Sequence, residues 1–208
     1  MLRLIVTCVC LLLLPSPGNL AARQKRRVYV DRGACEGEAC GYGPWKPTRA
    51  TVLRARPDAR SRRVGEVGPG PCVMALTGEV QVRTPGRFVV LKPRGLYRPG
   101  EVLTVYTYLG EEVYKVRHRG RWVAEQQLTY TPEPGPAERQ ECMSDQHCWG
   151  FFERKPDSTW WVKVRTGSGL VGWTDEPTNF IDPYWQDASD CKELHDEMRR
   201  KGAGPARR

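Results

Sequence analysis

Cysteine and histidine are the side chains in this chain best suited to covalent or metal chemistry. The 208 residues include eight cysteines and three histidines. Two of the cysteines lie in an apolar N-terminal run, and the six that follow it are Cys35, Cys40, Cys72, Cys142, Cys148 and Cys191. An even number of cysteines in an oxidising compartment favours disulfide bonds over free thiols.

The spacing of the six cysteines predicts how they pair. Two short intervals, Cys35–Cys40 and Cys142–Cys148, predict two small loops that are each closed by a disulfide. Cys72 and Cys191 then remain for a long-range pair. Other connectivities of six cysteines stay open at this point. Zinc binding is the alternative use, but neither interval is a C-x-x-C and histidines are few, so we expect no metal site.

Catalysis would need a nucleophile, a base and an orienting group within hydrogen-bond reach. His118 falls in an expected turn, His147 lies beside Cys148, and His195 lies on an expected terminal helix. The chain also lacks a Gly-rich phosphate loop and a serine-nucleophile elbow. We therefore expect no catalytic residue, no cofactor and no enzyme activity.

The N-terminus has the pattern of a secretory signal peptide over residues 1–22. One positive charge at Arg3 precedes an apolar run from Leu4 to Leu14, and small residues end at Ala22. This run is about half of the roughly 20 residues that span a bilayer. A retained anchor and lipid attachment at Cys8 are the alternatives. We expect a periplasmic or secreted protein with no stable membrane span.

The net charge of +9 is concentrated at the two ends of the chain. Ten of the 33 basic residues lie before residue 28 or after residue 198, which leaves 23 against all 24 acidic residues. A neutral middle argues against nucleic-acid binding, which needs basic residues interleaved with aromatics on one face. The basic tails are either solvated ends or a weak, salt-sensitive attraction to anionic envelope surfaces.

Residues 160–173 predict a β-hairpin around which the other strands are organised. Trp160, Val162 and Val164 alternate with polar or aromatic residues, which is the period of a half-buried strand. A Gly-Ser-Gly turn at 167–169 follows, because glycine tolerates positive φ. We expect Trp160 and Trp173 in the core and Trp161 half exposed.

The remaining chain reads as short strands separated by Gly and Pro. A second hairpin at 113–123 repeats the pattern of the first, since Tyr114–Arg117 matches Val162–Arg165 and each is followed by a glycine turn and a tryptophan. Residues 131–136 are rich in proline and predict a linker. Ser189–Lys201 predicts one short helix with Ser189 as its N-cap.

Three segments of the chain resemble the bacterial SH3-like domain, often called SH3b. Thr51–Val80 resembles its first half, Leu96–Val123 resembles its second half, and Trp160–Trp173 resembles the closing hairpin of a second copy. The order of a Cys-rich opening, an SH3-like unit and a Cys-Trp-Gly segment at 148–150 is similar to that of a set of bacterial envelope proteins. The resemblance covers about 100 of the 208 residues.

The expected fold class is all-β, with two small SH3-like barrels, disulfide-closed loops and one short C-terminal helix. An alternative is one barrel made from Thr51–Val80 and Trp160–Trp173, with everything between them inserted. The expected division is a signal peptide (1–22), a basic N-terminus with a Cys-rich cap (23–47), a first unit (48–128) with an insertion (81–95), a Pro-rich linker (129–141), a second, abbreviated unit (142–186), and a C-terminal helix with a basic tail (187–208).

The resemblance implies a small barrel that binds peptides or cell-wall material and has no catalysis of its own. Exposed rings on strand faces give contact area at low entropic cost, and a nearby carboxylate can recognise an amine. The candidate ligand residues on these grounds are Trp161, Trp122, Tyr106, Tyr108 and Asp157.

The function expected from the sequence is a non-catalytic binding module of the bacterial cell envelope. Its partner would be a peptide, peptidoglycan or an envelope protein. The first alternative is a structural or scaffolding protein that holds a partner subunit in the periplasm, and a further one is an accessory to a cell-wall hydrolase. The sequence leaves the oligomeric state open.

Overall fold

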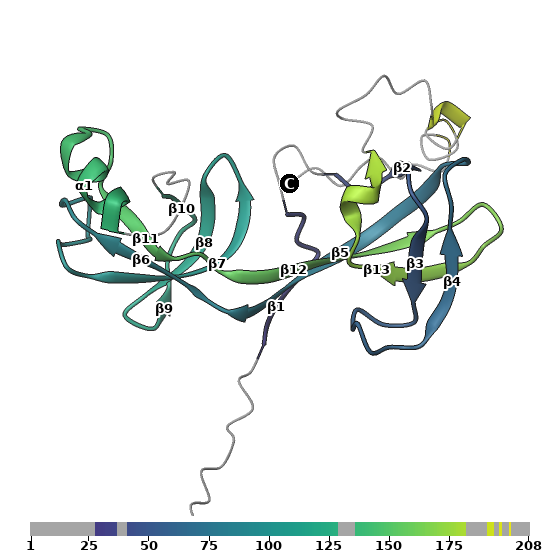
Figure 1. The fold of residues 1–208 in the computed structure, drawn as a ribbon, viewed down its shortest axis with the longest axis horizontal. Helices are drawn as coiled ribbons and strands as arrows, with labels where there is room; N and C mark the ends of the chain where they lie inside the picture. The colour runs from purple at the N-terminus through teal and green to yellow at the C-terminus, as the bar shows by residue number, and fades with distance from the viewer. Residues whose placement is uncertain are drawn as a thin grey trace, which may run out of the picture.

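The computed structural model describes residues 28–36, 41–128, 136–181, 191–193, 196 and 200. Its strands form two curled sheets, which build two lobes of an elongated molecule (Figure 1). The first lobe comprises residues 41–84 and 157–181, and the second lobe comprises residues 86–128 and 136–154. The prediction of an all-β fold is confirmed.

Two long strands, β5 (Val73–Thr84) and β12 (Asp157–Arg165), form the central pair of the molecule. They pair antiparallel along the whole of β12, from Asp157 opposite Thr84 to Arg165 opposite Met74. Figure 1 shows this pair running from the first lobe into the space between the lobes. Both strands contribute side chains to the hydrophobic core, since four of their valines are fully buried: Val80, Val82, Val162 and Val164.

The first lobe is a sheet in the order β14-β2-β5-β12-β13-β3-β4. Its core contains Trp45, Leu53, Val73 and Phe180 beside the valines of β12. β1 (Tyr29–Arg32) pairs with the second half of β5 and lies outside this order. The other strands of the lobe are β2 (Pro44–Pro47), β3 (Thr51–Arg54), β4 (Arg63–Val67), β13 (Val171–Thr174) and β14 (Phe180–Ile181), which follows a 3-10 turn, η1 (Pro177–Asn179).

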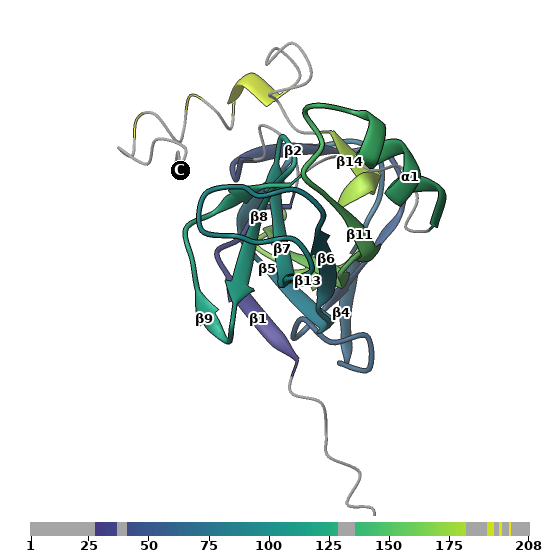
Figure 2. The same cartoon turned by 90° about the vertical axis from the view of Figure 1, so that its left-hand side faces the viewer.

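The second lobe is a separate sheet in the order β10-β8-β7-β6-β11, with β9 paired to β8. Phe88, Leu103, Val105, Val116 and Phe152 form the centre of its core, each at most 2% exposed. Figure 2 faces this lobe and shows the helix beside β11. Its elements are β6 (Gly86–Val90), β7 (Val102–Gly110), β8 (Val113–His118), β9 (Arg121–Trp122), β10 (Gln126–Gln127), α1 (Pro136–Ser144) and β11 (Gly150–Arg154).

The pairing of strands differs from the expected two consecutive units at 48–128 and 142–186. The hairpin of β12 and β13 pairs with β5 and β3, and therefore completes the sheet that begins at Thr51. This is the arrangement of the alternative, in which the intervening residues are an insertion. The chain leaves the first lobe because β5 continues past Val80 to Thr84 without a turn, and Pro85 then introduces β6.

The expected linker at 129–141 contains the start of a helix. Its residues 129–135 lie outside the described part of the chain, and Pro136 is the first residue of α1. Proline suits the first helical position because the N–H that it lacks would have no partner there. The prolines had indicated only that neither a strand nor a helix continues through this segment, so the nine-residue helix that begins at Pro136 was not expected.

The exposure expected for the three tryptophans of the closing hairpin is wrong. Trp161 is 3% exposed, whereas Trp160 and Trp173 are only partly buried. Trp161 lies opposite Glu79, on the same face of the ladder as Gln81. Gln81 donates a hydrogen bond of 2.6 Å to the carbonyl of Pro57, so the β3–β4 loop reaches this face of the ladder.

Both predicted disulfides that fall within the described residues are present. Cys142 is bonded to Cys148, and Cys72 is bonded to Cys191, 119 residues away. Cys35 is also disulfide-bonded, while Cys40, its expected partner, lies outside the described residues.

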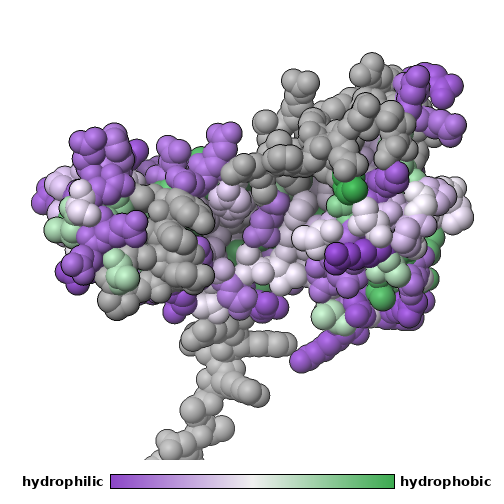
Figure 3. All heavy atoms as spheres, turned by 45° about the horizontal axis from the view of Figure 1, so that its top comes forward, coloured by the Kyte–Doolittle hydropathy of each residue, from purple (hydrophilic) through white to green (hydrophobic). Residues whose placement is uncertain are grey.

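The expected signal peptide, the basic tails and most of the expected C-terminal helix also lie outside the described residues. The described positions between Ser189 and Lys201 are helical. Among the described residues, no helix has the length and apolar character needed to cross a membrane. On the face seen in Figure 3, apolar residues are scattered among hydrophilic ones.

Gly78, at the middle of β5, offers a test of the central ladder. A Cβ atom at this position would lie 2.8 Å from the Trp161 carbonyl oxygen and closer still to the Tyr42 hydroxyl. Because this backbone is fixed by the ladder, Gly78→Ala is expected to lower the free energy of unfolding by about 1–3 kcal/mol in urea titrations followed by tryptophan fluorescence.

The matched control is Gly68→Ala, because Gly68 lies on the exposed turn before β5 and has open space around its Cβ position. Its effect is expected to stay within about 0.5 kcal/mol. Equal effects of the two substitutions would contradict the close packing of β5 against β12.

Candidate functional site

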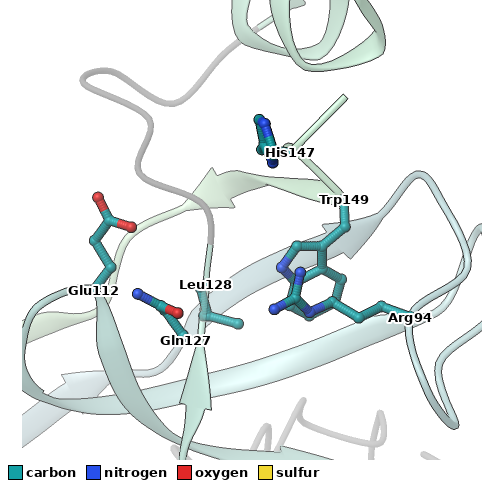
Figure 4. A pocket seen from close by; sticks show the side chains of 6 residues that line it. All are labelled: Arg94, Glu112, Gln127, Leu128, His147 and Trp149. Carbon is teal, nitrogen blue, oxygen red and sulfur yellow. The ribbon is translucent and has the colours of Figure 1, made fainter. Parts of the chain in front are cut away.

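A pocket of about 300 Å³ opens in the second lobe, a volume at the lower end of small-molecule sites. Four segments meet there: the β6–β7 loop, the β7–β8 turn, the end of β10 with the residue after it, and the segment between α1 and β11 (Figure 4). The lining residues are Arg94, Glu112, Gln127, Leu128, His147 and Trp149.

The floor of the pocket is rigid because it is part of the core. Trp149 is 4% exposed and Leu128 is 1% exposed. The Trp149 ring stacks on Tyr97 with centroids 5.7 Å apart and lies 4.7 Å from Phe88. Its carbonyl oxygen accepts hydrogen bonds from the backbone N–H groups of residues 91 and 92. The small part of the Trp149 and Leu128 side chains that reaches the pocket is therefore preformed.

Two opposite charges, those of Arg94 and Glu112, line the pocket beside this floor. The guanidinium carbon of Arg94 is 5.4 Å from the centroid of the Trp149 ring, within range of a cation–π interaction. Within the described residues, neither the Arg94 guanidinium nor the Glu112 carboxylate has a hydrogen-bond or ion-pair partner. Figure 4 shows the two side chains at opposite sides of the pocket, with Leu128 and Gln127 between them.

The turn that carries Glu112 is conformationally strained. Three consecutive residues have positive φ angles: 101° at Gly110, 48° at Glu111 and 63° at Glu112. Hairpin turns of this kind prefer Asn-Gly, because a side chain in the left-handed region costs about 1–3 kcal/mol. The Glu112 carbonyl accepts a 2.9 Å hydrogen bond from the Leu128 N–H, which fixes the turn against the pocket floor. Such strain concentrates at functional sites.

The segment carrying His147 and Trp149 is held by a disulfide and a lysine. The Cys142–Cys148 bond closes the loop between α1 and β11. The Lys92 ammonium donates to the carbonyl oxygens of Cys142 and Asp145, at 2.9 and 2.5 Å. The backbone N–H of His147 in turn donates to the Asp145 carboxylate at 2.8 Å. The β7–β8 turn and the segment between α1 and β11, which form two walls of the pocket, are thus held in place by the fold itself.

Glu101 anchors the end of the loop that carries Arg94. Its carboxylate accepts a 2.9 Å hydrogen bond from the Arg98 N–H, contacts His118 Nε2 at 3.1 Å and pairs with Arg119. These partners, the Arg98 N–H first and then Arg119, hold the pKa of Glu101 below its ordinary value. His118 also packs edge-on against Tyr97, at 5.1 Å between ring centroids, which links the carboxylate to the pocket floor.

Two of the predicted ligand residues do come together, outside the pocket. Tyr106 and Trp122 lie 4.8 Å apart and both contact Tyr29 of β1. Trp122 is 44% exposed, but the Arg117 guanidinium lies 4.4 Å over its ring and 5.6 Å over Tyr106. The cluster therefore already holds a cation from its own chain and packs β1 of the first sheet on the second lobe.

The other three predicted ligand residues are engaged in the fold. Tyr108 packs on Tyr114 at 5.1 Å, and Trp161 is buried. Asp157 accepts two hydrogen bonds from Arg83, of 3.0 and 3.2 Å, and this partner lowers its pKa. None of the five predicted residues lines the pocket.

Sequence reasoning missed all six pocket residues, because they come from four separate segments. Two signals were present. The first is the pair of glutamates that follows Gly110, at a hairpin turn where Asn-Gly is preferred. The second is the Cys-Trp-Gly sequence at 148–150, whose tryptophan, Trp149, forms part of the pocket floor.

The pocket lining offers a guanidinium, a carboxylate, a carboxamide, an imidazole and two apolar side chains. The thiols nearest in sequence to His147, those of Cys142 and Cys148, are joined in a disulfide. The part of the chain that the structure describes contains no group of three or more His, Cys, Asp or Glu placed to hold a metal ion. No family model, curated protein or solved structure matches the chain.

The lowered pKa of Glu101 predicts an acid-sensitive loop. A carboxyl group whose folded pKa lies below its unfolded value stabilises the protein above the unfolded pKa, and that stabilisation is lost as the pH falls through the folded pKa. We expect wild-type stability, measured as the urea midpoint, to fall between about pH 5 and pH 3. Glu101→Gln should be less stable at neutral pH and lose less over this range.

Glu125→Gln serves as the control, because Glu125 is exposed and its carboxylate has no partner among the described residues. It should reproduce the wild-type midpoints at every pH. If Glu101→Gln also followed the wild-type curve, the carboxylate would not be anchoring the loop.

Proposed function

We propose that this protein is a non-catalytic binding module exported to the bacterial cell envelope, where its pocket takes peptide or cell-wall material. The observation that carries the proposal is that Arg94 and Glu112, whose charged groups have no ion-pair or hydrogen-bond partner among the described residues, line a pocket whose floor is Trp149 and Leu128. Arg94 is exposed and Glu112 is partly buried, so both charges are hydrated and accessible to a ligand. A preformed concave site with a few placed polar groups is typical of ligand binding.

Strand order supports an SH3-like origin for the first lobe. The segments that resemble the first half and the closing hairpin of this domain occupy β3 to β5 and β12 with β13, which form one curled sheet. In this proposal the first lobe is the scaffold, and the second lobe, inserted between β5 and β12, carries the ligand site. The lining residues at 94 to 149 all belong to the inserted lobe.

Export is supported by the disulfides and by the N-terminal pattern. Disulfides persist in oxidising compartments, and Cys72–Cys191 and Cys142–Cys148 are both formed. The signal-peptide pattern at 1–22 would direct the chain there. We propose a periplasmic or secreted location.

A structural or scaffolding role is the second candidate. It is favoured by Leu96, which is 64% exposed on the loop that carries Arg94, and by Met143, which is 57% exposed on α1, just before the segment that carries His147. A partner subunit would cover such residues. The binding role is preferred because the apolar residues on the face in Figure 3 are scattered rather than gathered in one patch.

The proposed function is tested by co-sedimentation of the oxidised mature protein with purified peptidoglycan, at low salt and at about 0.15 M salt. A version without residues 23–27 and 199–208 removes the basic tails. We expect both proteins to sediment at both salt concentrations. Arg94→Ala should weaken binding about tenfold, as loss of a charge-assisted contact does.

Arg98→Ala is the matched control, because Arg98 is an exposed arginine of the same loop and does not line the pocket. It should bind as the wild type does. Binding that disappears with salt or with the tails would reduce the interaction to tail electrostatics. Equal losses in the two variants would move the ligand site away from the pocket.

A further inference from the structure

Arg94 and Glu112 line one pocket but do not form an ion pair with each other. Two opposite charges that are kept apart in one small cavity match a ligand that carries both charges itself. A ligand with a single charge would satisfy one side chain and leave the other desolvated, which is unfavourable. The separation of the two side chains thus limits the class of ligand.

Arg94 is suited to bind a carboxylate. Its guanidinium lies over the Trp149 ring, and an arginine stacked on an aromatic is weakly hydrated and oriented. Its N–H groups have no acceptor among the described residues, so they remain available for a bidentate contact with a planar acid. Such contacts recognise carboxylates by shape as well as by charge.

Glu112 is suited to bind an ammonium group. Its carboxylate has no cation among the described residues, and its backbone is fixed by the strained turn and by the Leu128 N–H. The Gln127 side chain lies between the two charges, and among the described residues its amide has one hydrogen-bond partner, the Glu111 carbonyl at 3.5 Å. Its amide oxygen can therefore accept a hydrogen bond from a peptide N–H.

We infer that the pocket holds a peptide-like zwitterion, with its carboxylate on Arg94, its ammonium on Glu112 and its aliphatic part on Trp149 and Leu128. This inference rests on the proposed function and specifies its ligand. A volume of about 300 Å³ suits a ligand of dipeptide size. A free dipeptide and the end of a cell-wall peptide carry the same groups, and the experiment separates them.

The experiment is calorimetric titration of the full mature protein with alanyl-alanine in its L,L and D,D forms. The same dipeptides are then used with the amino group acetylated or with the carboxylate amidated. We expect at least one parent dipeptide to bind, and either modification to weaken it at least about tenfold.

Two variants assign the charges. Arg94→Gln should bind the amidated dipeptide as tightly as it binds the parent dipeptide, because it has lost the guanidinium that recognises the carboxylate. Glu112→Gln should bind the acetylated dipeptide as tightly as it binds the parent, because it has lost the carboxylate that recognises the ammonium. The matched controls are Arg98→Gln on the same loop and Glu111→Gln on the same turn, neither of which lines the pocket. Both should keep the wild-type preference, and near-ultraviolet circular dichroism confirms that every variant is folded.

The source of the ligand is assigned by titrating solubilised peptidoglycan fragments that carry a free amino and a free carboxyl group. Tighter binding of the fragments than of the dipeptide points to the polymer, and equal binding points to free peptide.

The inference is overturned if no dipeptide binds at millimolar concentration, or if the acetylated and amidated forms bind as the parent does. If sedimentation with peptidoglycan still depended on Arg94, the proposed function would be retained and the ligand would be of a different chemical class. If the dipeptides do not bind and peptidoglycan sedimentation does not depend on Arg94, both the inferred ligand and the proposed function are rejected.

Discussion

Nine residue pairs hold β5 against β12 in one antiparallel ladder, and both lobes begin from it. Only Pro85 separates β5 from β6, and only Lys155 and Pro156 separate β11 from β12. The two ends of the second lobe therefore start at the same end of the ladder, where Thr84 lies opposite Asp157. Because the ladder brings these ends together, an insertion of about 70 residues carries little extra loop-closure entropy. Contacts of β1 with the second lobe, such as the 2.9 Å ion pair of Asp31 with Lys115, add to this connection.

The pocket combines a floor of core residues with a strained turn at its edge. Trp149 and Leu128 are core residues, and the disulfide and Lys92 fix the segment beside them. The rims contain a turn with two glutamates at positive φ and two charges without partners among the described residues. A chain selected only for folding would place Asn-Gly at the turn and pair the charges. Local conflicts of this kind mark the sites that a protein maintains for another purpose.

Local sequence patterns predicted where the strands and turns lie better than they predicted which strands pair with each other. Alternation and glycine turns located the hairpin of β12 and β13, and cysteine spacing predicted two disulfides that the structure contains. The choice of partner strands depends on contacts distant in sequence. The likeness of the hairpins at 113–123 and 160–173 favoured two consecutive units, whereas the second hairpin completes the first sheet and the residues between form the second sheet.

The errors at the candidate site have the same origin. Trp161 was expected to be half exposed from the alternation of its strand alone, whereas the structure buries it and brings the β3–β4 loop to the same face at Gln81. The pocket could not be assembled from sequence, since its residues lie in four segments and only the glutamate turn is locally unusual. Aromatic residues on strands suggested a site, but the structure uses Tyr106 and Trp122 to join the two sheets.

The most direct test of the pocket as the ligand site is a hydrogen-exchange footprint of the oxidised mature protein, with and without saturating peptidoglycan fragments. Slower exchange confined to residues 91–101, 111–113, 126–128 and 145–149 is the predicted result, because these segments form the walls. Exchange in β3, β4 and β13 should stay unchanged. Protection centred on the first lobe, or on Trp122 and Tyr106 instead of these walls, would contradict the assignment of function to the pocket.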